Sequence, residues 1–171
     1  MKCCIPLIKQ HKTLFVSVGV AILFVVLITH ATHLLICDSG SIPGVRVSLV
    51  LKGSPYKPGD MVGIKDHPVK YGGKKFLVKY VAGLPGDKIE RKSKEVHLIT
   101  QGSHNNEVFP QKFPLLKQTK DGRPLNPLEA TVVPKGYVFV AGDHLRSFDS
   151  RYLEFGLVHQ NHIIGRAIKL W

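Results

Sequence analysis

Cysteine is scarce in this sequence, and the positions of the few cysteines exclude a fold built on disulfide bonds. The 171-residue chain has three cysteines. Cys3 and Cys4 precede a long apolar segment, whereas Cys37 follows it and has no second cysteine on its own side of that segment. The sequence therefore does not describe a small secreted module held together by disulfides.

Acidic residues are absent before Asp38, although three lysines occur in that stretch. Residues 14–28 carry no charge, and the apolar run continues to residue 36. A helix of about 20 apolar residues crosses the hydrocarbon core of a bilayer. The sequence therefore predicts a transmembrane anchor over residues 14–36.

The position of the lysines predicts how this anchor is oriented. Because positive charge precedes the anchor, residues 1–13 are expected in the cytoplasm and residues 38–171 outside it. A cleaved secretory signal is an alternative, since Thr-His-Ala at residues 29–31 is an acceptable cleavage site. A buried core helix is a third interpretation, but the segment has no polar face. In the first two interpretations the globular part is exported.

Basic residues outnumber acidic residues by 24 to 12, which gives a formal net charge of +12. Such a surface attracts anionic partners, either lipid headgroups or nucleic acid. The lysines and arginines in residues 65–75 and 88–94 lie in turns, without the interleaved aromatic residues typical of nucleic-acid binding. We therefore expect a solvated basic surface near membrane lipids, and no nucleic-acid partner.

Short apolar and β-branched segments, separated by glycine and proline, follow the apolar run. They occupy residues 45–51, 61–64, 76–82, 89–99, 137–141 and 163–171. Short strands at close spacing indicate a mostly β domain rather than alternating β-α-β units. The pattern is lost at about residues 100–130, where proline and polar residues predict a loop-rich insertion within the same domain. No internal repeat is visible.

One predicted strand, residues 76–82, contains a lysine between apolar neighbours. Gly83 and Gly86 help to end this strand in a turn. Lys79 either alternates outward into solvent or points into an apolar pocket, where burial would favour the uncharged amine. An uncharged lysine is a general base, and a general base requires a nucleophile nearby.

Other catalytic arrangements find less support in the sequence. No G-x-S-x-G motif is present, so a hydrolase nucleophile elbow is not expected. A Ser-His-Asp arrangement through His144 or His67 lacks this elbow, and His67 precedes a proline in a turn. His159 and His162 have no cysteine or acidic partners at metal-ligand spacing. We therefore expect neither a metal site nor a cofactor.

Three sequence blocks carry a more specific signal. They are Ser-Gly-Ser-Ile-Pro at residues 39–43, Leu-Val-Lys-Tyr-Val-Ala-Gly-Leu-Pro-Gly-Asp at 77–87, and Gly-Asp at 142–143 followed by Ser-Phe-Asp-Ser-Arg at 147–151. Together these blocks resemble the signal peptidase I family of membrane-bound serine proteases with a Ser/Lys dyad. The resemblance covers nearly the whole chain. It implies a mostly β fold, with an N-terminal single transmembrane helix followed by a signal-peptidase-like β domain of antiparallel sheets.

The resemblance assigns catalytic roles to four residues. Ser41 matches the nucleophile of the family, and Lys79 matches its general base. Ser39 matches the serine whose hydroxyl binds the oxyanion together with the backbone N–H of Ser41. Ser147 matches a serine that hydrogen-bonds the lysine amine and orients it.

Four further positions match residues that support the site. Asp149 and Arg151 match a pair that braces it, and Gly142 and Asp143 match structural positions behind it. The chain departs from the family pattern at Tyr80, because a basic residue commonly follows the catalytic lysine. This departure leaves open whether an ion pair stands behind the base.

The resemblance implies a serine endopeptidase that cleaves exported precursor proteins after small residues, close to the membrane surface. The Ser-x-Pro turn, the compact insertion and the run Ser-Phe-Asp-Ser-Arg-Tyr are more similar to the branch that matures pilins and related pilus components in bacterial conjugation. A general type I signal peptidase of the secretory pathway is the alternative within the family. An inactive membrane-anchored scaffold of a transfer or secretion assembly is the alternative of another class.

The expected partners are the precursor substrate and membrane lipids. The expected location is the bacterial inner membrane, with the catalytic domain on the periplasmic side. A cytoplasmic self-cleaving repressor shares the Ser/Lys chemistry, but it would need a DNA-binding domain in place of the membrane span. The sequence leaves open the oligomeric state and the fate of the acyl-enzyme, which permits both hydrolysis and transfer to a second amine.

Overall fold

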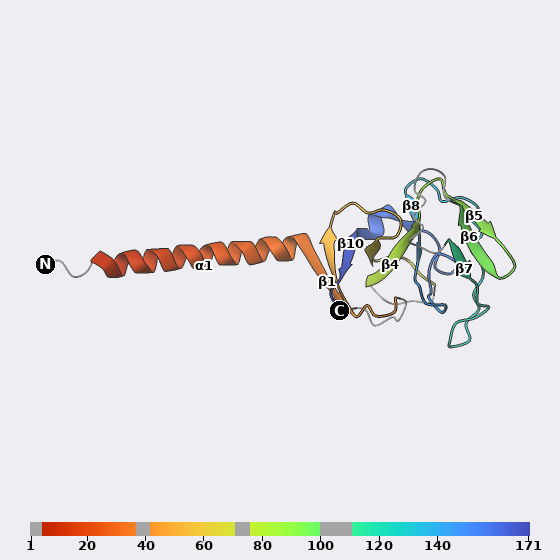
Figure 1. The fold of residues 1–171 in the computed structure, drawn as a ribbon, viewed down its shortest axis with the longest axis horizontal. Coiled ribbons are helices and arrows are strands. Elements are labelled where there is room, and N and C mark those ends of the chain that lie inside the picture. The colour runs from red at the N-terminus through yellow and green to blue at the C-terminus, as the bar shows by residue number, and fades with distance from the viewer. Residues whose placement is uncertain (1–4, 37–41, 71–75, 100–110) are drawn as a thin grey trace. The chain divides into compact units, whose positions relative to one another are not determined.

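The computed structural model describes residues 5–36, 42–70, 76–99 and 111–171 (Figure 1). The chain divides into two compact units, Met1–His33 and Leu34–Trp171. The first unit is mainly one helix, and the second is built from β-strands.

The helix α1 (Ile5–Ala31) has 27 residues. Its segment Leu14–Ala31 has a mean hydropathy of 2.5, and none of that segment is buried within the protein. The hydroxyls of Ser17 and Thr29 donate to backbone carbonyls about one turn earlier in the helix, so these polar groups are satisfied without water. The helix is therefore long and apolar enough to cross a membrane, and its insertion into a membrane stays a prediction.

The helix ends before the predicted anchor does. The sequence predicts an anchor through residue 36, whereas α1 ends at Ala31 and the strand β1 (Thr32–Ile36) follows it. Leu35 in this strand is buried in an apolar cluster of the β domain. Burial of Leu35 gives one apolar residue at the end of the run a place in the β domain, whereas Leu34 and Ile36 are exposed. The division of the chain into a cytoplasmic end, an anchor and an exported domain stays a prediction.

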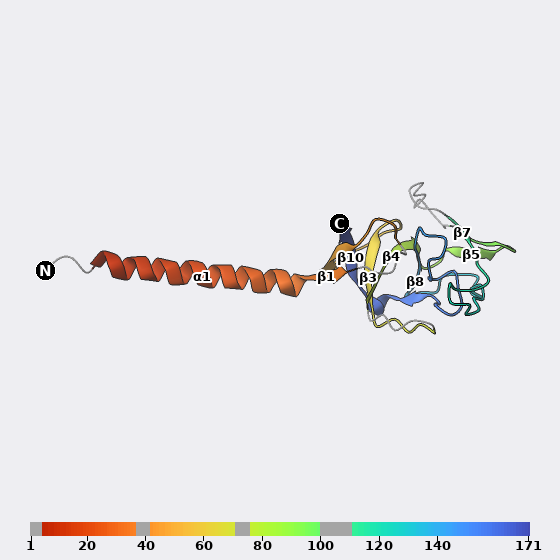
Figure 2. The same cartoon turned by 90° about the horizontal axis from the view of Figure 1, so that it is seen from below.

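Two sheets form the second unit (Figures 1 and 2). The larger sheet has the strand order β1-β2-β10-β3-β4-β8-β9. Its strands after β1 are β2 (Val47–Lys52), β3 (Met61–Lys65), β4 (Phe76–Gly83), β8 (Tyr137–Ala141), β9 (Val158–His159) and β10 (Ile163–Lys169). The smaller sheet consists of β5 (Lys88–Arg91), β6 (Glu95–Ile99) and β7 (Lys112–Pro114). A short 3₁₀ helix, Gln160–His162, joins β9 to β10.

Every strand pair whose register is described is antiparallel. The predicted mostly β fold of antiparallel sheets behind one apolar helix is therefore confirmed. The predicted loop-rich insertion falls partly outside the described residues, and its extent stays a prediction. Within it, the structure adds the short strand β7, which pairs with β6.

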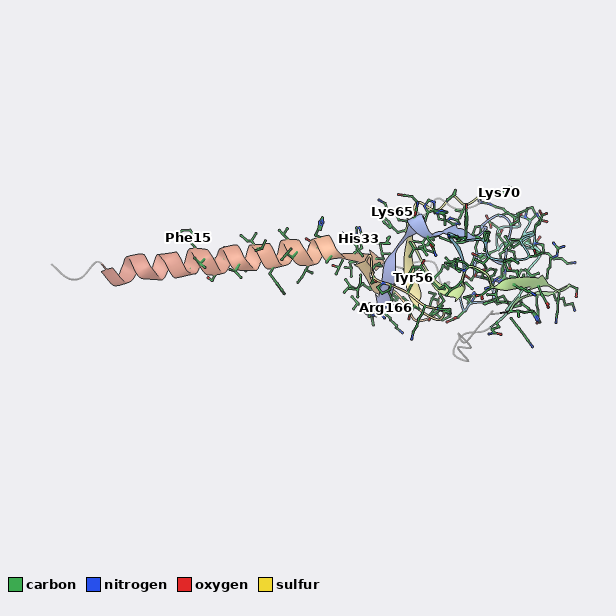
Figure 3. All side chains as sticks on the ribbon, turned by 90° about the horizontal axis from the view of Figure 1, so that it is seen from above. Phe15, His33, Tyr56, Lys65, Lys70 and Arg166 are labelled. Atoms are coloured by element: carbon green, nitrogen blue, oxygen red, sulfur yellow. The ribbon has the colours of Figure 1, made fainter. Side chains whose placement is uncertain are left out.

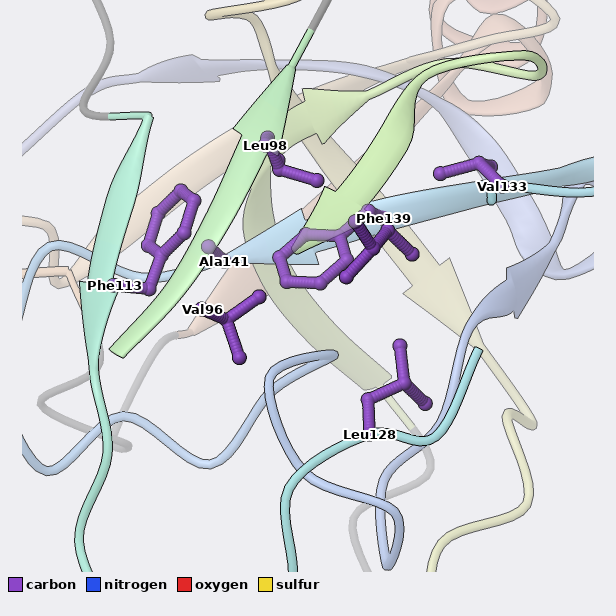
Figure 4. Close-up of a cluster of buried hydrophobic side chains, with 8 residues drawn as sticks. Val96, Leu98, Phe113, Leu128, Val133, Phe139 and Ala141 are labelled. Atoms are coloured by element: carbon purple, nitrogen blue, oxygen red, sulfur yellow. The ribbon is translucent and has the colours of Figure 1, made fainter. Parts of the chain in front are cut away.

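A cluster of buried apolar side chains joins the smaller sheet to β8 (Figure 4). Val96 and Leu98 from β6 and Phe113 from β7 meet Phe139 and Ala141 from β8 in this cluster. The rings of Phe113 and Phe139 have their centroids 5.6 Å apart. Burial of a side chain of this size stabilises the fold by roughly 1.5–3 kcal/mol. The cluster thereby fixes the strand that leads into the third sequence block.

Strand β4 lies inside the larger sheet, between β3 and β8, and both of its faces are covered. Side chains alternate between the two faces along a strand. Val78 packs with Ile42 and Val45 in one apolar cluster. Val81 packs in a second cluster, to which β3, β8 and β9 contribute most of the residues. The side chain of Lys79 points to the face of the sheet opposite to that of its neighbour Val78, and it therefore lies on the same face as Val81.

Candidate active site

Strand β4 carries Lys79 into the interior of the β domain. This lysine is only 2% exposed, and its register partner in β3 is Val62. Removing an ammonium group from water disfavours its charged form unless nearby groups compensate. Of the two positions that the sequence allows for this side chain, the structure shows the buried one.

A hydrogen bond joins Lys79 to Ser147, with Nζ donating to Oγ at 2.8 Å. Ser147 is also 2% exposed, and it lies 68 residues further along the chain. The backbone N–H of Ser147 donates to the carbonyl of His144 at 2.9 Å, so a tight turn holds the serine in place. The structure thus brings the predicted base together with the serine predicted to orient it.

The predicted nucleophile Ser41 and the predicted oxyanion residue Ser39 lie outside the described residues. The described chain resumes at Ile42, which is buried. Ile42 and Val45 pack in the same cluster as Val78, the residue directly before the buried lysine. The residues that follow Ser41 are therefore anchored beside the strand that carries the predicted base.

Asp149 and Arg151 form a buried ion pair, with exposures of 0% and 1%. Nε of Arg151 lies 2.7 Å from Oδ1 of Asp149, and Nη2 lies 2.9 Å from Oδ2. A buried ion pair needs further hydrogen bonds to offset its lost hydration. Asp149 accepts the N–H of Gly142 at 2.9 Å. Arg151 donates to the carbonyls of Gly142 and Pro114, each at 3.1 Å.

This ion pair holds the backbone of Gly142 through both its N–H and its carbonyl. Gly142 directly follows β8 and begins the loop that carries Ser147. The guanidinium of Arg151 also lies over the ring of Phe113, 5.6 Å from its centroid, which ties the pair to the smaller sheet. These are the contacts of a structural brace, and their effect on catalysis stays a prediction.

Tyr80, where the family commonly has a basic residue, hydrogen-bonds the side chain of Asp143. Burial raises the pKa of Tyr80, and the charge and hydrogen bonding of Asp143 raise it further. Asp143 is exposed, but partial desolvation raises the pKa of its carboxyl, which the hydrogen bond from Tyr80 opposes. The sequence did not predict this pair, although the departure at Tyr80 was its signal.

His144 and His67 have contacts that do not belong to a Ser-His-Asp arrangement. His144 is exposed, and its Nδ1 accepts the backbone N–H of Arg146 at 3.1 Å. His67 is buried, with Nε2 2.9 Å from the carbonyl oxygen of Phe155. Burial lowers the pKa of His67 and so favours its neutral ring.

His159 and His162 lie near each other, with ring centroids 6.4 Å apart. Nδ1 of His159 accepts the N–H of Asn161, and Nδ1 of His162 lies 3.1 Å from the carbonyl oxygen of Lys65. Across the described ranges, no group of three or more histidine, cysteine, aspartate or glutamate residues is placed to hold a metal ion. The described contacts of these two histidines are thus with backbone groups of Asn161 and Lys65.

Comparisons with known proteins give consistent relatives. The chain is 38% identical over 97 residues to signal peptidase I of Bacillus caldolyticus, which covers 55% of this chain and 52% of that relative. It is 32% identical over 141 residues to signal peptidase IB of Staphylococcus aureus, covering 75% of this chain and 69% of that relative. Among solved structures, signal peptidase I from Enterococcus faecalis V583 is 25% identical, with a TM-score of 0.40, and covers 66% of this chain and 97% of that one.

The chain spans about half the length of the Bacillus relatives that it matches. A family model described as "Signal peptidase, peptidase S26" matches residues 7–171, which is nearly the whole chain. This match includes nearly all of the apolar helix, the ten strands of the described residues and each of the three sequence blocks. As those blocks predict, the chain belongs to the signal peptidase (peptidase S26) family.

Proposed function

We propose that this protein is a membrane-anchored serine endopeptidase that cleaves exported precursor proteins, with Ser41 as nucleophile and Lys79 as general base. The observation that carries the proposal is a lysine only 2% exposed, with its Nζ 2.8 Å from Oγ of Ser147. A lysine kept out of water is biased toward the uncharged form that accepts a proton. Membership of a peptidase family supports the same chemistry.

The proposed reaction passes through an acyl-enzyme. The uncharged amine of Lys79 accepts the hydroxyl proton of Ser41 while the serine oxygen attacks the scissile carbonyl carbon. The oxyanion is held by the backbone N–H of Ser41 and the hydroxyl of Ser39, and such donors contribute roughly 3 kcal/mol each. The carbon–nitrogen bond then breaks as Lys79 passes the proton to the leaving amine. A water activated by the same amine releases the product and restores Ser41.

Ser147 and the residues behind it act as positioning residues in this proposal. The hydroxyl of Ser147 restricts a long, flexible side chain to one place for Nζ, which reduces the entropy lost in reaching the transition state. The Asp149–Arg151 pair fixes the start of the same loop at Gly142. The loop is thereby held where Ser147 meets the base.

The helix α1 supplies the anchor of the enzyme. In this proposal residues 1–13 lie in the cytoplasm, and the helical part of the predicted anchor, residues 14–31, lies in the bacterial inner membrane. The strand β1 and residues 38–171 lie in the periplasm. The unburied apolar surface of Leu14–Ala31 supports a membrane span. Because Ser41 follows the anchor by a few residues, the cut site lies close to the lipid surface.

Exposed basic side chains support an interaction of the β domain with lipid. Lys65, Lys70 and Arg166 are exposed at different places on this domain (Figure 3). Cationic side chains near a membrane are attracted to anionic headgroups by about 1 kcal/mol each. We propose that these residues face anionic lipid in the membrane-bound enzyme.

We propose a conjugative pilin precursor, or a related pilus component, as the substrate, cut after small residues. The Ser-x-Pro turn at residues 41–43 and the run Ser-Phe-Asp-Ser-Arg-Tyr at residues 147–152 support this branch. Signal peptides of the general secretory pathway are the second candidate, because the relatives of this chain are named signal peptidase I and IB.

A matched cleavage assay tests the proposed dyad. Full-length wild type, Ser41→Ala and Lys79→Ala are incubated in membranes or detergent with a pilin precursor and with a secretory precursor, and the cut sites are read by mass spectrometry. Both variants should lose cleavage while keeping the wild-type circular dichroism. Lys135→Ala removes an exposed lysine before β8 that has no role in the proposed site, and this control should cut like wild type.

The outcomes separate the remaining possibilities. Cleavage by either dyad variant at the wild-type rate would refute the mechanism, and the precursor that wild type cuts identifies the branch. If the wild type cuts neither precursor, and the Ser41→Ala protein supports conjugative transfer or secretion in cells as fully as the wild type, the protein is an inactive scaffold. Cleavage by wild type should increase from mildly acidic to alkaline pH as Lys79 loses its proton, and a flat profile would count against Lys79 as the base.

A further inference from the structure

A cavity of about 340 Å³ lies beside the proposed active site. Ser147, whose hydroxyl accepts the hydrogen bond from Lys79, forms part of its wall. The other lining residues come from the loop around Ser147, from Tyr152 and from residues 116–125. The cavity therefore borders the residue that hydrogen-bonds the proposed base.

The inner part of the cavity is apolar. Leu125 and Tyr152 are buried, and Phe148 stacks on Tyr152 with ring centroids 6.4 Å apart. The hydroxyl of Tyr152 accepts the backbone N–H of Leu116 at 3.1 Å, so this polar group already has a partner. Such a wall favours an aliphatic or aromatic side chain over a polar one.

The outer part of the cavity is cationic. Lys120 and Arg146 line it and are exposed, and none of the described residues that line it is acidic. The nearby carboxylate of Asp121 already accepts the Thr119 hydroxyl at 2.6 Å and pairs with Arg123 at 2.8 Å. Lys120 and Arg146 therefore give the outer part of the cavity a positive charge.

The turn that presents Lys120 is well defined. The N–H of Thr119 donates to the carbonyl of Arg123 at 2.9 Å, and the N–H of Leu125 donates to the carbonyl of Lys117 at 2.9 Å. On the other side, the turn from His144 to Ser147 holds Arg146. Both cations thus come from segments with fixed backbones, as a selective site requires.

We propose that this cavity is a substrate subsite that binds an acidic side chain and its apolar neighbour in the precursor, beside the bond to be cut. The apolar side chain packs on Leu125, Phe148 and Tyr152, and the carboxylate lies between Lys120 and Arg146. The proposal rests on the proposed peptidase function. It adds a preference for acidic residues to the requirement for small residues before the cut.

A peptide series tests the subsite through cleavage by the full-length enzyme in detergent. Each peptide carries a small-x-small cut site and a leucine next to one glutamate, which is moved through the flanking positions and compared with glutamine. At one position glutamate should raise kcat/KM by roughly threefold to tenfold, the range expected for one or two partly exposed charge pairs. Lys120→Glu and Arg146→Glu should each remove most of this preference, and should favour lysine at the same position.

A binding measurement tests the subsite independently of catalysis. The same peptides, labelled with a fluorophore, are titrated into the Ser41→Ala protein and followed by anisotropy. The glutamate peptide should bind more tightly than the glutamine peptide, and added salt should reduce the difference. Lys135→Glu changes an exposed lysine before β8, outside the cavity lining, and is the matched control that should keep the preference.

The results distinguish the two proposals. If the wild type cleaves none of the peptides while the Ser41→Ala protein still binds the glutamate peptide more tightly, the peptidase function is refuted and the cavity remains a binding site. Equal binding and equal cleavage of the glutamate and glutamine peptides at every position would overturn the subsite. An equal loss of preference in Lys120→Glu and Lys135→Glu would also overturn it, because the effect would then come from net charge alone.

Discussion

The change Asp149→Ala is expected to destabilise the β domain more than most single substitutions. In the wild type, the Asp149 carboxylate receives two charge-assisted hydrogen bonds from Arg151, at 2.7 and 2.9 Å, and one from the N–H of Gly142 at 2.9 Å. The guanidinium is only 1% exposed. After the change, the carbonyls of Gly142 and Pro114 are the described acceptors that remain to it.

The magnitude follows from leaving a buried charge without its counter-ion. Breaking a buried ion pair by removing one partner costs about 3–5 kcal/mol. The N–H of Gly142 also loses its acceptor, and an unsatisfied buried donor costs about 1–3 kcal/mol, part of which is contained in the first figure. We expect a loss of about 4 kcal/mol, a large share of the roughly 5–15 kcal/mol that stabilises a protein of ordinary size.

Urea unfolding of the full chain in detergent, followed by circular dichroism, measures this loss. The double variant with Asp149→Leu and Arg151→Met replaces the ion pair by apolar side chains and should be less destabilised than Asp149→Ala alone. A loss below about 1 kcal/mol for Asp149→Ala would refute the reasoning, since measured exposed ion pairs have that value. Asp149→Leu and Arg151→Met are also measured singly. Strict additivity of their effects in the double variant would likewise refute the reasoning, because residues in direct contact are coupled.

Changes at three further positions test other parts of the structure. Tyr80→Phe removes the hydroxyl that bonds Asp143 and should lower the free energy of unfolding by about 1 kcal/mol and slow cleavage. We expect the slower cleavage because Tyr80 is the neighbour of Lys79 in β4 and its contact with Asp143 helps to hold that strand beside the loop of Ser147. Tyr80→Arg, which allows an ion pair with the same carboxylate, should restore cleavage in the same assay, and no recovery would contradict this role of the contact. Gly165→Ala places a methyl group onto the carbonyl oxygen of Leu51 at a φ of 153°, so thermal unfolding should show a loss of about 1–3 kcal/mol or more. Because burial lowers the pKa of His67, the unfolded chain binds a proton more readily than the folded protein. The free energy of unfolding should therefore fall as the pH drops below the ordinary histidine value of 6.5, and His67→Gln should weaken that dependence in urea unfolding at a series of pH values.

The longer strands could be predicted because their pattern is local. The predicted strands at 61–64, 76–82 and 137–141 lie within one residue of β3, β4 and β8. The strand β1 was predicted as part of the anchor, because its apolar residues continue that run. The strands β7 and β9 were not predicted, and they have only three and two residues. Such short segments show no periodicity, and their extended form depends on pairing with β6 and β8.

Some contacts in the site could likewise be predicted from the sequence, and others could not. Lys79 and Ser147 were predicted from residue identity within the sequence blocks, and the structure joins them by a hydrogen bond of 2.8 Å. The partner of Tyr80 could not be predicted, because a tyrosine has many possible acceptors. The β4–β8 pairing, in which Tyr80 lies opposite Ala141, brings Asp143 within its reach.

By itself the sequence determined the apolar helix and the family, because hydropathy and motif order are properties of the chain before it folds. It left the environment of Lys79 open, because the two faces of an isolated strand are equivalent. Only the tertiary structure decided this, by covering both faces of β4 and bringing Ser147 to Lys79 from 68 residues away. Burial and long-range contacts of this kind arise only when separate segments pack, and the buried lysine that they create carries the proposed chemistry.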